Sequence, residues 1–158
     1  MFGWEIQAFL TRDFISRIAF ENGGLFFASD LPLDITYPAA FVINVAFLEG
    51  KKNQRHWVAI YIDPFKQGYY FDSFGLPPLD NKIKLFLKQV TCVWKYSTIA
   101  IQCVTSTKCG YFCLYFLFHR CRGWTFDQIL QAFKRVSVLK NDKIVLTWFQ
   151  NQNSSLAF

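Results

Sequence analysis

Residues 105–117 read TSTKCGYFCLYFL, and the change from polar to apolar side chains at Cys109 decides the expected architecture. The run that begins at Cys109 and continues to Cys121 is apolar on nearly every side, which predicts a helix buried through the core. Gly123 is expected to end this helix. The polar residues before Cys109 place its thiol at the helix N-terminus, where we expect it to face solvent.

Short apolar segments upstream of this helix predict a meander of strands with turns between them. The expected strands cover 40–48, 56–62 and 69–72, and a fourth covers 94–102. Polar turns are expected at 50–55 and 63–68. A short extended piece is expected at 25–30.

Helices are expected on both sides of the strand region. Apolar periodicity predicts one over 4–20 and another over 81–90, the latter capped by Asp80 or Asn81. Thr125 and Gln128 have the spacing of a capping box, which predicts a helix that runs to about Arg135. A last helix is expected over 143–150, capped by Asn141 or Asp142.

The composition indicates one folded domain over residues 1–158. Hydrophobic residues make up 53% and aromatic residues 20% of the chain, too much apolar material for a disordered protein. The net charge of +6 fits either a nucleic-acid partner or an ordinary basic surface. Neither a membrane span nor a secretory signal is visible, and we expect a protein that is not secreted.

Cysteine usage points to free thiols rather than disulfides or metal. The chain has five cysteines, an odd number, which favours a reducing compartment. A zinc site is not expected, because the sequence has no C-x-x-C pair and its two histidines, His56 and His119, lack zinc-finger spacing.

Cys109 is the strongest candidate for a nucleophile. A helix N-terminus stabilises a thiolate through its N–H groups and dipole. Gly110 would let a substrate backbone approach closely. A buried structural thiol is the commoner state of a cysteine in an apolar stretch, and Cys113 and Cys121 fit that description better.

Three polar residues upstream could complete a thiol-protease site, although each has an ordinary structural explanation alone. His56 opens a strand and is the candidate base, because His119 lies inside the predicted helix. Asp72 would lie at the same end of an antiparallel hairpin as His56 and could orient its ring, or it could simply form a turn. Gln102 could donate to an oxyanion together with the backbone N–H of Cys109.

The order His56, Asp72, Gln102, Cys109 resembles that of the adenovirus-type cysteine proteases, relatives of the ubiquitin-like-protein proteases. The segments that carry the match are HWVAIYID (56–63), YYFDSFG (69–75), IQ (101–102) and TSTKCGYFCLYFL (105–117). Adenoviral enzymes usually have Glu at the acidic position. The Asp therefore favours a relative, such as those of polinton (Maverick) elements and related double-stranded DNA viruses.

This resemblance implies both a fold and a set of roles. The implied fold is α+β: a mixed, largely antiparallel sheet packed against a buried central helix that carries the catalytic Cys, with flanking helices. Cys109 would be the nucleophile and His56 the general base. Asp72 would orient His56, and Gln102 would contribute to the oxyanion hole.

The resemblance also implies a biological setting. The enzyme would be a monomer that cleaves viral precursor proteins after small residues, at Gly-rich sites, during virion maturation, in the virion and the host nucleus or cytoplasm. The chemistry itself would need no cofactor. The adenoviral enzymes are activated by DNA and by a disulfide-linked peptide. Cys92 lies near the position of the peptide-linked cysteine, although an ordinary thiol explains it equally well.

Three other functions stay open at this stage. The same site could act on host ubiquitin-like conjugates, as a deubiquitinase or SUMO protease does. Some relatives with this constellation are acetyltransferases, although no acetyl-CoA signature is visible. A non-catalytic nucleic-acid-binding module would explain the basic charge and the aromatic residues, but it would leave the order of the four polar residues to chance.

Overall fold

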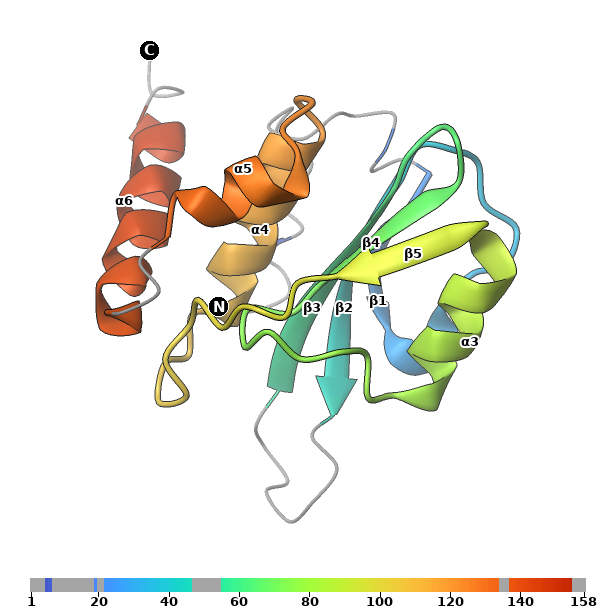
Figure 1. The fold of residues 1–158 in the computed structure, drawn as a ribbon, viewed down its shortest axis with the longest axis horizontal. Coiled ribbons are helices and arrows are strands. Elements are labelled where there is room, and N and C mark those ends of the chain that lie inside the picture. The colour runs from blue at the N-terminus through green and yellow to red at the C-terminus, as the bar shows by residue number, and fades with distance from the viewer. Residues whose placement is uncertain (1–4, 7–18, 20–21, 47–54, 134–136, 155–158) are drawn as a thin grey trace.

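A five-stranded sheet with helices on both faces forms the protein (Figure 1). The structure, a computed structural model, describes residues 5–6, 19, 22–46, 55–133 and 137–154. The strands are β1 (Gly24–Phe27), β2 (Ala39–Ala46), β3 (Arg55–Ile62), β4 (Gln67–Phe71) and β5 (Val93–Tyr96). The helices are η1 (Ala28–Asp30), α3 (Asn81–Val90), α4 (Cys109–Arg120), α5 (Phe126–Gln131), η2 (Val138–Lys140) and α6 (Asn141–Ser154).

The strands lie in chain order across the sheet, β1-β2-β3-β4-β5. The central pairs β2–β3 and β3–β4 are antiparallel, and the two outer pairs, β1–β2 and β4–β5, are parallel. This is the mixed sheet of an α+β protein, as the sequence predicts. β1 and β5 add the parallel pairs to the expected meander.

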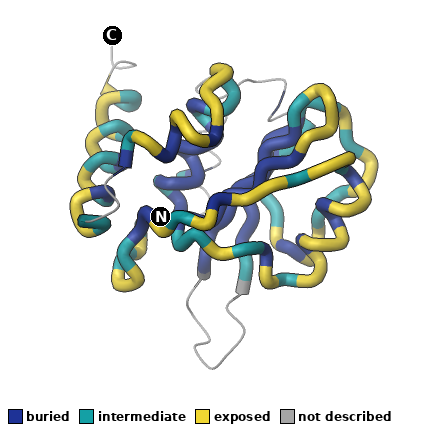
Figure 2. The backbone as a smooth tube through the Cα atoms, in the orientation of Figure 1, coloured by how far each residue is buried: buried dark blue, intermediate teal, exposed yellow. Residues whose placement is uncertain are grey.

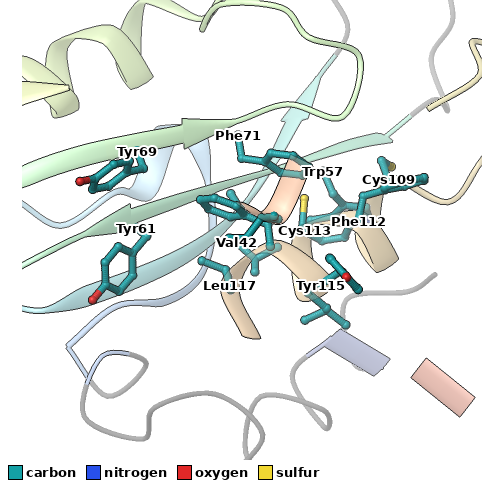
Figure 3. Close-up of a cluster of buried hydrophobic side chains, with 14 of the residues drawn as sticks. Val42, Trp57, Tyr61, Tyr69, Phe71, Cys109, Phe112, Cys113, Tyr115 and Leu117 are labelled. Atoms are coloured by element: carbon teal, nitrogen blue, oxygen red, sulfur yellow. The ribbon is translucent and has the colours of Figure 1, made fainter. Parts of the chain in front are cut away.

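Side-chain alternation along the central strands creates two cores, one on each face of the sheet. Val42, Trp57 and Phe71 face α4, whereas Phe41 and Ile60 face α3. Figure 3 shows the first of these clusters, in which Phe71 and Trp57 of the sheet face Phe112 and Cys113 of α4. Because both faces are covered, β2 and β3 read as nearly continuous apolar runs.

Helix α4 is the buried element that the apolar run predicts. It lies against the sheet, and α5 and α6 pack around its other side (Figure 1). The central strands and α4 form the buried part of the backbone, while the outer sides of α3, α5 and α6 are exposed (Figure 2). Among the described helices, none is long and apolar enough to cross a membrane.

Several local predictions are confirmed. β2, β3 and β4 match the expected strands to within two residues at each end that is described. Helix α3 spans the predicted residues, and the Asp80 side chain caps it by accepting from the N–H of Lys82. Thr125 and Gln128 form the expected capping box at the start of α5.

Other boundaries differ from prediction. The fourth strand was expected to reach Gln102, but β5 ends at Tyr96 because the N–H groups of Ile101 and Gln102 both donate to the carbonyl of Ser73. Helix α5 ends earlier than expected, at Gln131. Most of the predicted helix over 4–20 and of the turn at 50–55 lies outside the described residues.

Helix α6 is longer than predicted, because it begins at Asn141 and runs to Ser154. Asn141, one of the two predicted caps, is the first residue of the helix. It is fully buried, and its Nδ2 donates to the carbonyl of Ile101 at 2.8 Å. That contact ties the start of α6 to the segment that leads into α4.

Candidate active site

His56 and Asp72 meet at one end of the β3–β4 hairpin. His56 lies near the start of β3, and Asp72 directly follows β4. The antiparallel register, with Ala59 opposite Phe71, brings them together, and Nε2 of His56 lies 3.0 Å from Oδ1 of Asp72. The two residues are only 4% and 5% exposed, so solvent screens this contact weakly.

Cys109 approaches the same imidazole from helix α4. It is the first residue of α4, and its thiol lies close enough to His56 to raise the pKa of that imidazole. Because Nε2 of His56 faces Asp72, Nδ1 is the ring nitrogen left for the thiol. A single imidazole therefore joins the end of β4 to the N-terminus of α4.

The expectation that Cys109 faces solvent is wrong, because the residue is only 7% exposed. The first turn of α4 belongs to the core cluster that contains Trp57 and Phe112 (Figure 3). The polar loop before Cys109 therefore does not carry its thiol to the surface.

The environment of His56 favours its protonated form. Burial is the largest single effect and lowers the pKa of His56. The hydrogen bonds and the negative charges of Asp72 and Cys109 together outweigh burial, and they raise the pKa from 6.5 to about 9. At neutral pH the charged imidazolium is thus favoured beside Asp72.

Gln102 is held in a fixed orientation close to this group. Its Nε2 donates to the carbonyl of Ser106 at 2.9 Å and to Ser106 Oγ at 3.2 Å. Because a carbonyl only accepts, the amide nitrogen must point toward Ser106. Oε1 then accepts a hydrogen bond from the hydroxyl of Ser73, on the opposite side.

The same contacts link Gln102 to the neighbours of Asp72 and Cys109. Ser73, whose hydroxyl and carbonyl both bond Gln102, directly follows Asp72. Ser106 Oγ accepts from the N–H of Lys108, the residue before Cys109. The four predicted residues therefore converge, with Asp72 and Cys109 both beside His56 and Gln102 held between residues that neighbour Asp72 and Cys109 in the chain.

The sequence analysis did not find two residues that shape this site. The ring of Phe74 stacks on the imidazole of His56, with ring centroids 4.9 Å apart and planes inclined by 24°. Ser73 is fully buried and orients the Gln102 amide. The strand register could have identified Phe74, because continuing the β3–β4 pairing places it opposite His56.

The surroundings of His119, Cys113 and Cys121 indicate structural rather than catalytic roles. Nδ1 of His119 lies 2.8 Å from the carbonyl of Tyr115, and burial lowers the pKa of His119. Cys113 is fully buried, and burial raises the pKa of its thiol well above the ordinary value. Cys121 was expected inside the helix but lies at its C-cap, half-buried.

Cys92 is an exposed free thiol in the segment between α3 and β5. It lies beside a surface groove of about 660 Å³. The groove is formed by the loop after β4, by α3 and by β5, and is lined by Pro77, Pro78, Leu79, Lys84, Lys88, Thr91, Cys92, Val93 and Trp94. A role in attaching a peptide stays a prediction, as does DNA binding.

No family model and no curated protein matches the sequence. Among solved structures, the chain resembles the pS273R protease of ASFV with 20% identity and a TM-score of 0.49, over 70% of this chain and 43% of that one. A selenomethionine form of the same protease gives 18% identity and a TM-score of 0.48, over 68% and 45% of the two chains.

The fold is also similar to that of ChlaDub1 from Chlamydia trachomatis, with 14% identity and a TM-score of 0.54, over 75% of this chain and 62% of that one. This chain thus spans about half of the length of the solved proteins that it resembles. The likeness to ChlaDub1 shows a shared α+β fold.

Proposed function

We propose that this protein is a cysteine peptidase in which Cys109 is the nucleophile and His56 is the general base. The observation that carries the proposal is the placement of one buried imidazole between a carboxylate and a thiol. Nε2 of His56 lies 3.0 Å from Oδ1 of Asp72, and the Cys109 thiol is close enough to the same ring to raise its pKa. The fold shared with ChlaDub1, a deubiquitinase, supports this chemistry.

In the proposed first step, the proton of the Cys109 thiol moves to Nδ1 of His56. Asp72 stabilises the resulting imidazolium and holds the ring by accepting from Nε2. The thiolate lies at the N-terminus of α4, where the helix dipole favours negative charge. A thiolate–imidazolium pair is the reactive form of a cysteine protease.

The thiolate then attacks the substrate carbonyl carbon, and the carbon–oxygen π electrons move onto oxygen. The tetrahedral intermediate collapses as the imidazolium gives its proton to the leaving amine and the C–N bond breaks. Water, deprotonated by the neutral His56, attacks the thioester, and the C–S bond breaks to release the acid and the Cys109 thiol.

Gln102 would donate to the oxyanion together with the backbone N–H of Cys109. Both observed contacts of the Gln102 amide nitrogen are to Ser106, and the one to Oγ is longer, at 3.2 Å. We propose that the oxyanion replaces this longer contact, while the bond to the Ser106 carbonyl keeps the amide in place.

Substrates with small residues at the scissile bond fit the site best. The sulfur of Cys109 belongs to a residue only 7% exposed, and the neighbouring Gly110 is also buried. We propose that this limited access to Cys109 favours glycine over residues with bulky side chains. Together with the resemblance to the adenovirus-type proteases, this supports Gly-rich sites in viral precursor proteins as the substrate class.

Ubiquitin-like conjugates are the second candidate substrate. The fold shared with ChlaDub1 favours this class, because that protein is a deubiquitinase. The chemistry at Cys109 would be the same, and the two proposals differ in what the surface around Cys109 recognises.

An activating peptide, as in the adenoviral enzymes, could attach at Cys92. The exposed thiol beside an apolar groove supports this proposal, since both covalent and side-chain contacts are available there. The test uses a peptide whose cysteine is presented as an activated mixed disulfide. We expect the Cys92 thiolate of wild type to attack the peptide sulfur and displace the activating thiol, and we expect turnover to rise. Neither should occur with Cys92→Ser.

The function is tested with internally quenched peptides that contain a Gly-Gly site and with vinyl sulfone probes built on ubiquitin-like proteins. We expect cleavage by wild type, none by Cys109→Ala, and normal cleavage by the control Cys121→Ala. Labelling by the probes would favour conjugates over precursor proteins. Activity that persists in Cys109→Ala contradicts the assigned nucleophile.

A further inference from the structure

Phe74 packs against the proposed general base at very short range. The Phe74 and His56 ring centroids are 4.9 Å apart, and the ring planes are inclined by only 24°. Continuing the β3–β4 register beyond its last pair, Ala59 with Phe71, brings Phe74 opposite His56. The stack therefore follows from the same hairpin that places Asp72.

The backbone of Phe74 is tied to the carboxylate that contacts the imidazole. Its N–H donates to Oδ1 of Asp72 at 2.8 Å, and the same oxygen lies 3.0 Å from Nε2 of His56. The turn then closes through the N–H of Gly75, which donates to the Asp72 carbonyl at 2.9 Å. Gly75 has a φ of 71°, and a Cβ there would meet backbone atoms of Ile99 and Ala100 at 2.7 Å.

We propose that Phe74 is a positioning residue for His56, holding the plane of the imidazole with one ring face and stabilising the imidazolium by cation–π attraction. This inference rests on the proposed role of His56 as general base. A ring fixed in this way keeps Nε2 on Asp72 and Nδ1 on Cys109 through both proton transfers. An aromatic face attracts a cation that lies within about 6 Å of its centre.

Replacing the Phe74 side chain leaves the other groups that act on His56 chemically the same. Within the described part of the chain, the charged or titratable groups that act on the imidazole are Asp72, at the end of β4, and Cys109, at the start of α4. A side chain that only filled space would lower stability on replacement but would leave the protonation equilibrium of His56 where it is. The titration of His56 therefore separates the two roles.

The test is an NMR titration of the histidine side chains in the full chain. The sequence has only two histidines, so His119 serves as an internal reference in every spectrum. Phe74→Leu and Phe74→Met remove the ring at similar volume, and Phe74→Tyr keeps it. Phe65→Leu is the matched control, since Phe65 lies in the β3–β4 turn and is 81% exposed.

We expect the His56 midpoint to fall by about half a pH unit to one unit in the Leu and Met variants. It should stay unchanged in Phe74→Tyr and Phe65→Leu, and the His119 midpoint should not move in any variant. The rate of Cys109 alkylation near neutral pH should fall by about threefold to tenfold in the ring-free variants only.

An unchanged His56 midpoint in both ring-free variants would overturn the inference. Two aliphatic replacements are used because Phe74 is half-buried and at least one should fold. The titration needs no substrate, so its result is independent of peptide cleavage. A shifted midpoint in a protein that cleaves no peptide would support the positioning role while contradicting the proposed function.

Discussion

The Nε2 atom of His56 lies 3.0 Å from Oδ1 of Asp72, although His56 belongs to β3, Asp72 follows β4, and both are nearly inaccessible to solvent. This contact does two things at once. It leaves Nδ1 of the ring for Cys109, and it supplies the charge that keeps the imidazolium stable in spite of its burial.

Replacing Asp72 with Asn should therefore reduce kcat/KM by about two to four orders of magnitude, because the amide removes the charge and can present the wrong tautomer to the ring. Steady-state cleavage of a quenched peptide measures this. Asp127→Asn is the control, since Asp127 is exposed on α5. An Asp72→Asn enzyme with wild-type kinetics would remove Asp72 from the mechanism.

Stability should depend on pH through His56. Its pKa in the folded protein, about 9, lies above the ordinary value of 6.5, so its contribution is fully present below about pH 6.5 and is lost as pH rises through 9. The contribution is about 3 kcal/mol.

Urea unfolding at about pH 6 and about pH 10 tests this dependence. The loss of unfolding free energy in wild type should exceed the loss in His56→Gln, because other groups that titrate in this range are common to both proteins. Equal losses in the two proteins would show that the His56 pKa is not raised.

Ser73→Ala should weaken catalysis through Gln102. Without the hydroxyl, Oε1 of Gln102 loses its donor, and the amide is less firmly oriented. We expect kcat to fall by about tenfold with little change in KM, and Gln102→Ala to cost about 10²–10³ in kcat.

A double-mutant cycle on kcat distinguishes an effect of Ser73 through Gln102 from a direct effect of Ser73 on catalysis. Ser73→Ala should have almost no further effect in a Gln102→Ala background. Fully additive effects would mean that Ser73 acts independently of the Gln102 amide.

The stacked pair Phe71 and Phe116 should dominate the core between the sheet and α4. Their ring centroids lie 4.7 Å apart, the planes are nearly parallel, and each residue is 1% exposed. Phe116→Ala should cost about 3–5 kcal/mol of unfolding free energy. The exposed Phe65→Ala should change it by less than about 0.5 kcal/mol, and a similar loss in both would contradict this view of the core.

Local patterns in the sequence predict the central elements well. The apolar alternation of β2 and β3, the Asp80 cap and the Thr125 capping box all depend on residues close in the chain. The sequence predicts that the strand continues past Tyr96 to Gln102. This segment instead bonds Ser73, which lies far away in the chain. The carbonyl of Ser73 draws the N–H groups of Ile101 and Gln102 away from any ladder.

The same distinction explains what could be foreseen of the site. The meeting of His56 and Asp72 could be predicted, because turn signals and side-chain alternation indicate the strand register. The burial of Cys109 could not be predicted from the sequence, because it depends on how α4 packs against Trp57. Phe74 belongs to no motif, and its importance becomes visible only when its ring is seen against His56.

The central claim, that His56 activates Cys109, is tested most directly by the alkylation rate of each thiol at about pH 6, where an ordinary thiol is almost wholly protonated. Limiting iodoacetamide and peptide mass spectrometry give the rates, with the exposed Cys92 as internal standard. The account predicts that Cys109 reacts at least about tenfold faster than Cys92 in wild type, and that His56→Gln abolishes this difference. A Cys109 that reacts no faster than Cys92, or one that is unaffected by the loss of His56, would contradict it.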